Sequence, residues 1–327
     1  MYNYNNIKEI HLEVTSKCQA RCPMCPRRIS GGRMNPFVKL DEITLIQFKK
    51  WFPTDFVKQL TKLFMCGNLG DPILAQDTLE IFKYLREHNS TMHLSMHTNG
   101  SARSKTWWSD LAEVNVGVTF GLDGLADTHN LYRIATDWHK IIENATAFIN
   151  NGGTAEWHML VFKHNEHQIE ECRTIAKEMK FDNFIVKHTS RFKNDKWAVL
   201  DERGFPTHYL EPTSKSESMI PLVQEGITAV SCISCKAKEQ NQLYIAATGV
   251  VSPCCWLDLE WILPSQESRI DYMERIGKFP NLNKNSLKEI FESNYFTDIE
   301  STWENNPLQE CSKQCGKFNR LGAQFES

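Results

Sequence analysis

The sequence predicts an α/β fold in which parallel strands alternate with helices. Over the first two hundred residues, short apolar runs typical of strands are followed by amphipathic segments typical of helices, and this pair occurs six times. Strands connected through helices pair in parallel, with right-handed crossovers. Six such units are too few to close an eight-stranded barrel.

The individual elements follow from their residue patterns. In the first strand, Ile10, Leu12 and Val14 alternate with His11 and Glu13, which is the two-residue period of a half-buried strand. Strands are expected at residues 8–15, 61–66, 92–97, 115–121, 156–162 and 182–188. Helices are expected at residues 41–52, 77–88, 104–113, 138–150 and 166–180, and near 196–203.

Two helices have clear end signals. The helix at 138–150 has Asp137 as a suitable N-cap and ends before Gly152–Gly153, which cannot continue it easily. Much later in the chain, Ser286 and Glu289 have the three-residue separation of a capping box, which predicts that a helix begins there.

Composition excludes several classes of protein. The net charge of −3 gives no electrostatic reason to expect nucleic acid or a membrane surface as a partner. No stretch approaches the roughly 18 apolar residues that span a bilayer, and the first residues do not resemble a secretory signal. Eleven cysteines in a large chain without such a signal are expected to bind metal or lie in the core of a cytoplasmic protein.

Three cysteines follow the first predicted strand. Cys18, Cys22 and Cys25 stand in the stretch CQARCPMC, so they belong to a loop at the carboxyl end of that strand. A 4Fe–4S cluster normally takes four thiolates, and three would leave one iron open to a small ligand. A structural zinc site is the alternative, but zinc needs a fourth ligand at short spacing, and the nearest histidine, His11, lies inside the strand.

This cysteine spacing resembles the signature of the radical S-adenosylmethionine (SAM) enzymes. The resemblance implies a partial (β/α)6 barrel, a 4Fe–4S cluster on Cys18, Cys22 and Cys25, and SAM bound at the open iron. It further implies that one electron cleaves SAM to a 5′-deoxyadenosyl radical, which takes a hydrogen atom from the substrate. The family usually has an aromatic residue before the third cysteine, and here Met24 occupies that cofactor-binding position.

Two turns after later strands resemble SAM-binding motifs of this family. Residues Gly70, Asp71 and Pro72 match the end of a Gly-Gly-Glu-Pro motif, with Asp in place of Glu. In the family this segment receives the SAM amino group, which suits carbonyl and carboxylate acceptors. The predicted third strand ends in Thr98-Asn99-Gly100, and the family has a similar triplet near the SAM ribose and carboxylate. Without the cysteine motif, both would be ordinary turns.

The fourth predicted strand ends in Gly121-Leu122-Asp123-Gly124, followed by Arg133. Related enzymes have Ser-Leu-Asp-Gly here and a later arginine, so the resemblance implies a SAM-binding role for Asp123 and Arg133. Gly121 stands in place of the serine and removes one hydroxyl contact. A guanidinium could hold the SAM carboxylate with two hydrogen bonds, and an ordinary surface salt bridge is the alternative.

Other residues are candidates from their position alone. The loop after the cysteines carries basic residues that could bind a substrate anion or be simply solvated, namely Arg27, Arg28 and Arg33. Three residues close the sixth predicted strand and could contact substrate, namely Lys187, His188 and Arg191. Cys66 and Cys172 are expected to be core residues.

A second group of cysteines lies in the last third of the chain. The runs 242–247 and Val250–Val251 flank Thr248–Gly249, which predicts a β-hairpin whose second arm leads to Cys254 and Cys255. The region resembles the SPASM/Twitch extension of radical SAM enzymes, which implies an auxiliary 4Fe–4S cluster. The expected ligands are Cys235, Cys254, Cys311 and Cys315, with Cys232 and Cys255 as alternates, and a zinc site is the other interpretation.

The expected domains are a radical SAM partial barrel at 1–212, a linker at 213–231, and a small SPASM/Twitch-like domain of β-hairpin and helix at 232–327. The resemblance implies hydrogen abstraction from a small polar, sugar-like or phosphorylated substrate, with the auxiliary cluster accepting an electron or positioning the substrate. A flavodoxin or ferredoxin would donate electrons. A peptide maturase and a non-catalytic zinc-binding protein are the alternatives.

Overall fold

The computed structural model describes residues 3–192, 194–214, 230–259 and 266–318. Its main sheet has eight strands in the order β11-β10-β1-β2-β3-β4-β5-β6, and all neighbours are parallel except β10 and β11. The strands are β1 (Glu9–Leu12), β2 (Lys62–Met65), β3 (His93–Thr98), β4 (Gly117–Gly121), β5 (Ala155–Leu160), β6 (Asn183–Lys187), β10 (Gln242–Ile245) and β11 (Val251–Ser252). The predicted α/β fold, its six parallel strands and the helices after the first five of them are confirmed.

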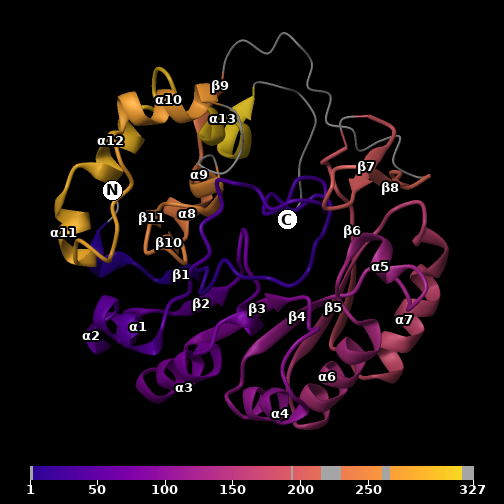
Figure 1. Ribbon diagram of the computed structural model, residues 1–327. Coiled ribbons are helices and arrows are strands. Elements are labelled where there is room, and N and C mark those ends of the chain that lie inside the picture. The colour runs from indigo at the N-terminus through magenta and orange to yellow at the C-terminus, as the bar shows by residue number, and fades with distance from the viewer. Residues whose placement is uncertain (1–2, 193, 215–229, 260–265, 319–327) are drawn as a thin grey trace.

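Helices cover the outer face of this curved sheet (Figure 1). The covering helices are α1 (Leu45–Trp51), α2 (Thr54–Gln59), α3 (Thr78–His88), α4 (Lys105–Glu113), α6 (Trp138–Asn150) and α7 (Ile169–Glu178). The short helix α5 (His129–Tyr132) follows β4, and its Tyr132 packs with Ala20 and Cys22 of the loop after β1. Helix α6 begins at the predicted N-cap, where the Asp137 side chain accepts a hydrogen bond from the Lys140 N–H.

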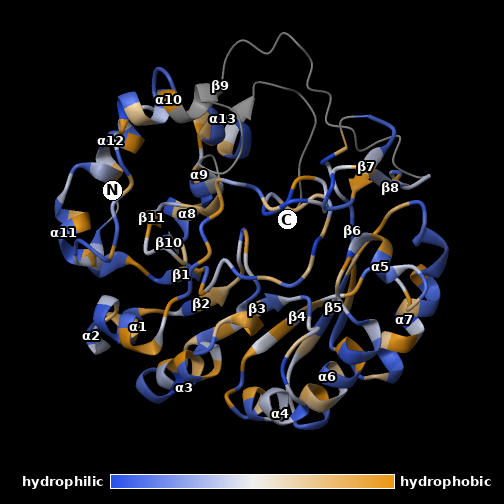
Figure 2. Ribbon diagram, viewed as in Figure 1, coloured by the Kyte–Doolittle hydropathy of each residue, from blue (hydrophilic) through white to orange (hydrophobic). Residues whose placement is uncertain are grey.

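Side chains on the two faces of the sheet differ in polarity. On β5, Trp157 and Met159 are fully buried against the helices, whereas Glu156 and His158 alternate with them in sequence and turn to the other face. The helices carry both apolar and polar residues, as an amphipathic covering layer should (Figure 2). The apolar core therefore lies between helices and sheet, and the inner face remains polar and open for a site.

The helix predicted near 196–203 is wrong. This segment forms strand β7 (Trp197–Leu200), which pairs antiparallel with β8 (Pro206–Leu210). The Asp201 carboxylate accepts hydrogen bonds from the Arg203 and Phe205 N–H groups. These hydrogen bonds stabilise the turn between β7 and β8. Most of the predicted linker, at 213–231, lies outside the described residues.

The C-terminal region is attached to the barrel sheet by its hairpin. Strand β10 pairs in parallel with β1, and β11 returns antiparallel, so the predicted hairpin is confirmed. The other elements of this region are β9 (Val230–Ile233), α8 (Lys236–Glu239), α9 (Cys255–Leu259), α10 (Gln266–Arg275), α11 (Leu287–Glu292), α12 (Tyr295–Ser301), α13 (Gln309–Cys315) and β12 (Gly316–Phe318). The predicted capping box of Ser286 and Glu289 opens α11.

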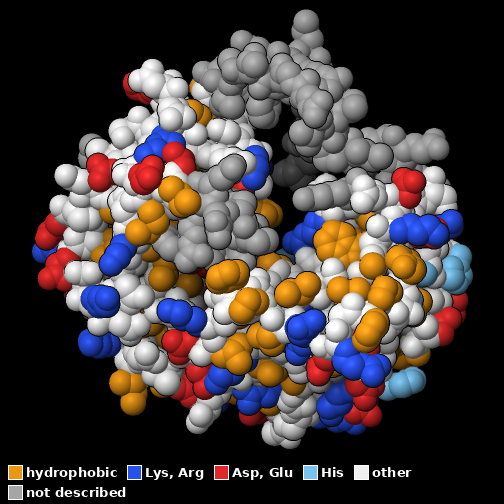
Figure 3. All heavy atoms as spheres, turned by 45° about the horizontal axis from the view of Figure 1, so that its top comes forward, with side chains coloured by type: hydrophobic (Ala, Val, Ile, Leu, Met, Phe, Trp, Pro, Cys, Tyr) orange, Lys and Arg blue, Asp and Glu red, His pale blue; other side chains and the backbone are white. Residues whose placement is uncertain are grey.

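Charges of both signs are interspersed on the face of the molecule in Figure 3. This distribution agrees with the small net charge of −3. Within the described part of the chain, the helices are too short or too polar to cross a membrane.

Candidate active site

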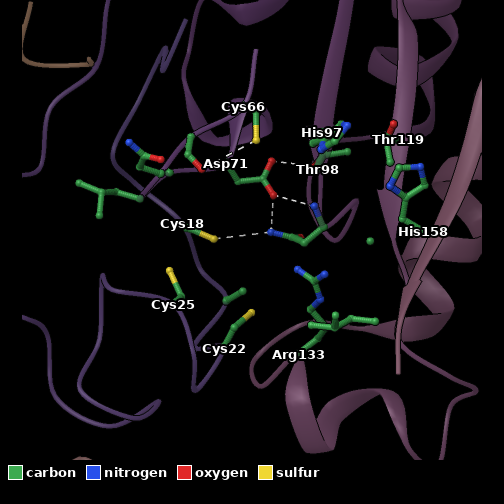
Figure 4. Close-up of a pocket in the computed structure, with 18 of the residues that line it drawn as sticks. Cys18, Cys22, Cys25, Cys66, Asp71, His97, Thr98, Thr119, Arg133 and His158 are labelled. Atoms are coloured by element: carbon green, nitrogen blue, oxygen red, sulfur yellow. Dashed lines mark hydrogen bonds between the residues drawn. The ribbon is translucent and has the colours of Figure 1, made fainter. Parts of the chain in front are cut away.

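A cavity of about 370 Å³ lies at the carboxyl ends of the parallel strands. Figure 4 shows the three cysteine sulfur atoms turned toward one space on one side of it, with His97, Thr119 and His158 across from them. The lining includes Cys18, Cys22, Cys25, Cys66, Gly70, Asp71, His97, Thr98, Asn99, Thr119, Gly121, Arg133, His158, Lys187 and Arg191.

The cysteine loop after β1 is held from within by Arg27. Its side chain is buried, and its guanidinium donates hydrogen bonds to the carbonyl oxygens of Cys18 and Ala20. Arg27 therefore shapes the loop instead of facing a ligand or solvent. Arg28 likewise donates to the Gly32 carbonyl oxygen at 2.6 Å, so this basic residue also acts within its own loop.

The three thiols of this loop are neutral near pH 7 unless a cation binds beside them and stabilises the thiolate form. Burial raises the pKa of Cys22 to about 11, and it also raises the pKa of Cys18 and of Cys25. A bound metal centre would supply the positive charge that buried thiolates need. Among the described residues, no three His, Cys, Asp or Glu side chains converge closely enough to hold a single metal ion. Three thiolates from one loop are the ligand set that a 4Fe–4S cluster with one open iron needs.

Asp71 ties the two predicted SAM-binding turns together. Its buried carboxylate accepts hydrogen bonds from the Thr98 hydroxyl at 2.7 Å, the Asn99 N–H at 2.7 Å and the Asn99 side-chain amide at 2.6 Å. Burial raises the pKa of Asp71, although these hydrogen bonds oppose that shift. The Asn99 amide also lies 3.6 Å from the Cys18 sulfur, so both turns meet at the cysteine loop.

Glu13 was not predicted as a site residue, yet it anchors the same region. Its buried carboxylate accepts hydrogen bonds from the Leu69 N–H at 2.7 Å, the Gly70 N–H at 3.1 Å and the Tyr244 hydroxyl at 2.8 Å. Its position alternates with apolar residues of the strand, so the sequence identified it only as polar. Because Tyr244 belongs to β10, Glu13 joins the turn before Asp71 to the C-terminal hairpin.

Replacing Tyr244 with phenylalanine should destabilise the protein by about 1–3 kcal/mol, because one oxygen of the buried Glu13 carboxylate loses its donor. Chemical unfolding of the reconstituted enzyme measures this loss. The control is Tyr209→Phe, since the Tyr209 side chain is exposed. Equal stability of the two variants would contradict the anchoring role of Glu13.

Arg133 reaches the cavity from the turn after α5. Its guanidinium makes a 2.5 Å ion pair with the fully buried Asp123, and it lies beside the Cys22 thiol. Burial alone would lower the pKa of Arg133, but Asp123 and Cys22 raise it well above the ordinary value. A Cβ atom on Gly121 would lie 2.7 Å from the Arg133 Nη2 atom, so the glycine at this position provides room for the guanidinium.

Some of the predicted cofactor-binding residues line the cavity, and others lie outside its lining. The cavity wall includes Gly70, Asp71, Thr98, Asn99 and Arg133. The others lie outside the cavity lining, namely Met24, Pro72, Gly100 and Asp123. Cys66, which was predicted to be a core residue, lines the cavity instead, and burial raises the pKa of its thiol to about 12.

The four favoured cysteines of the C-terminal region line one small cavity, namely Cys235, Cys254, Cys311 and Cys315. Cys232 is exposed and lies in a different surface hollow, and Cys255 is absent from the four-cysteine cavity. The carbonyl of Cys255 accepts a hydrogen bond from Asn68 at 2.9 Å, so this residue contacts the turn of the first cavity. The indole of Trp303 lines the four-cysteine cavity, and its buried N–H faces the Cys311 thiol.

The chain matches the models of two protein families. A model of the radical SAM superfamily matches residues 12–176, which is half of the chain, and a model of the SPASM iron–sulfur cluster-binding domain matches residues 235–316. The chain therefore belongs to the radical SAM superfamily and carries a C-terminal SPASM extension. It is an enzyme whose cofactors are a 4Fe–4S cluster, SAM and an auxiliary iron–sulfur cluster.

Solved structures share this fold. Streptococcus suis SuiB bound to S-adenosylmethionine is 14% identical, with a TM-score of 0.58 over 95% of this chain and 71% of that chain. Native anSMEcpe with bound AdoMet and Cp18Cys peptide is 17% identical, with a TM-score of 0.55 over 94% of this chain and 85% of that chain. At these identities the likeness concerns the fold.

Proposed function

We propose that this enzyme cleaves SAM reductively in the cavity at the ends of the barrel strands and abstracts hydrogen from a small polar substrate. One observation carries the proposal: the thiols of Cys18, Cys22 and Cys25 face the same cavity as the Asp71–Asn99 turn pair and the Arg133 guanidinium. When bound, the cluster and SAM supply an electron and a 5′-deoxyadenosyl radical that takes a hydrogen atom from the substrate.

The chain's own residues would bind and orient these groups. Cys18, Cys22 and Cys25 would hold three irons. Arg133, kept charged by Asp123, would donate two parallel hydrogen bonds to the SAM carboxylate. The carboxylate of Asp71 is already occupied by Thr98 and Asn99, so its main role would be to fix both turns in position.

The C-terminal cavity would hold one auxiliary cluster on Cys235, Cys254, Cys311 and Cys315. The buried indole N–H of Trp303 supports this assignment, because it faces the Cys311 sulfur and would donate a hydrogen bond to a thiolate or cluster sulfur there. The auxiliary cluster would accept an electron from the substrate or help to position it.

Anaerobic reconstitution tests the proposal. About eight irons per chain are expected for two clusters. About four irons per chain would show that the auxiliary cluster is absent. Addition of dithionite and SAM should then release 5′-deoxyadenosine, which chromatography measures. Bound zinc in place of iron, with no cleavage of SAM, would contradict the proposed function.

Replacing Gly121 with alanine should weaken SAM binding about tenfold, which equals about 1.4 kcal/mol, because the new Cβ displaces the Arg133 guanidinium. Gly117→Ala on the same strand is the control, because its Cβ would meet no atom closer than 3.8 Å. Isothermal titration of the reconstituted enzyme with SAM measures the change, and unchanged affinity would argue against the Arg133 contact.

A peptide substrate is the second candidate, since structures of two similar proteins hold peptides. SuiB has been solved with the precursor peptide SuiA, at 15% identity and a TM-score of 0.53 over 92% of this chain and 65% of that chain, and anSMEcpe with Cp18Cys. We further propose a flavodoxin or ferredoxin as electron donor and the cytoplasm as the location. No disulfide joins any of the eleven cysteines, which suits a reducing compartment.

A further inference from the structure

The cavity wall across from the cysteine loop is built by four parallel strands. His97 from β3, Thr119 from β4, His158 from β5 and Lys187 from β6 all line it. His97 pairs in register with Thr119, and the rings of His97 and His158 lie 5.5 Å apart between centroids. Figure 4 shows His97, Thr119 and His158 gathered on this side, away from the three sulfur atoms. We refer to these four residues as the far wall.

One imidazole of the far wall is oriented by a carboxylate behind it. The His158 Nε2 atom lies 3.0 Å from a Glu156 oxygen, and the Asn183 amide donates to the other Glu156 oxygen at 2.9 Å. Since a carboxylate only accepts, Nε2 carries the proton and Nδ1 becomes an acceptor. Within the described chain, that Nδ1 has no hydrogen-bond partner.

The second imidazole has both ring nitrogens available. His97 makes ring contacts with Phe64 and His158 but no hydrogen bond to any described residue. Burial lowers the pKa of His97 to about 4 and also lowers the pKa of His158. Both rings are therefore neutral near pH 7, and each offers the donor or acceptor that a hydroxyl group needs.

The charge facing this side of the cavity is positive. Lys187 forms no ion pair with any part of the chain that the structure describes, and Arg191 donates one hydrogen bond to the Met24 carbonyl oxygen at 2.7 Å. Asp71 and Glu156 are already engaged by hydrogen bonds from their neighbours. The Lys187 ammonium group would attract an anion bound here. Glu156 keeps its negative charge but is absent from the cavity lining, and the Asp71 carboxylate lies against Thr98 and Asn99.

Resting on the function proposed above, we propose that the far wall is the substrate subsite and that it binds a small hydroxylated anion. Lys187 receives the anionic group, a carboxylate or a phosphate, and Arg191 adds to the positive potential there. His97, Thr119 and His158 form hydrogen bonds with the substrate hydroxyls. Glu156 is a positioning residue, because it fixes the ring of His158 without facing the ligand.

Calorimetric titration of the reconstituted, SAM-saturated enzyme tests this subsite with three probes: glucose 6-phosphate, glucuronate and glucose. At least one of the two anions should bind about tenfold or more tightly than glucose. Preference for one anion identifies phosphate or carboxylate as the recognised group. Lys187→Gln should abolish the preference, whereas Lys177→Gln, which removes an exposed lysine of α7 outside the cavity, should keep it.

Three results would overturn the subsite: glucose binding as tightly as both anions, no binding of any probe, or an unchanged preference in Lys187→Gln. Release of 5′-deoxyadenosine is measured on the same sample. Normal release without a preference for anions contradicts the subsite alone. Absent release with the expected binding contradicts the proposed function and leaves the subsite intact.

Discussion

Replacing Cys18, Cys22 and Cys25 with alanine is expected to reduce the release of 5′-deoxyadenosine to the background of dithionite and SAM without enzyme. These thiols face the cavity together, so their loss leaves no side chains in the loop that can hold the cluster. Iron should fall from about eight to about four atoms per chain, because the C-terminal cysteines remain. Chromatography of the nucleoside and iron assays measure the two effects.

Cys172→Ala is the matched control for this variant. Cys172 is a fully buried thiol of α7 that belongs to neither cysteine group, so its loss should affect packing but not iron content. Release of 5′-deoxyadenosine by the triple variant at the rate of the control would show that SAM is cleaved elsewhere.

Replacing Gly70 with alanine is expected to weaken SAM binding by about a hundredfold, or about 2.7 kcal/mol, with a similar loss of stability. A Cβ atom there would overlap the backbone carbonyl of Thr15, in the chain between β1 and the cysteine loop. The Gly70 backbone cannot move away without disturbing the hydrogen bonds that Leu69 and Gly70 donate to Glu13 and those that Asp71 accepts from Thr98 and Asn99. Titration with SAM and chemical unfolding measure the two losses.

The Gly117→Ala variant again serves as the control, because its new Cβ would make only ordinary contacts. If Gly70→Ala and Gly117→Ala bind SAM equally well, the close approach of the two loops is not needed for binding.

The sequence predicted the parts of this fold that depend on local pattern. The six parallel strands and the hairpin before Cys254 are recognised because each has a strong period or turn signal. The segment Trp197–Leu200 was mistaken for a helix, because a short apolar run has no period that separates strand from helix. Only its pairing with β8 makes it a strand, and that pairing depends on the turn at Asp201.

The sequence predicted those parts of the site whose residues lie close together in one short motif. The spacing of Cys18, Cys22 and Cys25 is visible in one short stretch, whereas the contribution of Glu13 depends on partners 56 and 231 residues away. The room that Gly121 provides for Arg133 likewise requires the packed structure. Long-range hydrogen bonds and close approaches of this kind have no local signature.

The parallel pairing of β10 with β1 has a consequence for shortened forms of the protein. A chain ending at residue 229 would lose the neighbour of β1 and leave an uncovered row of backbone donors and acceptors. Such a row invites strand exchange between molecules, so the isolated N-terminal portion should aggregate even if every one of its helices forms. The C-terminal extension therefore covers the edge strand β1 of the catalytic portion, whether or not the auxiliary cluster is bound.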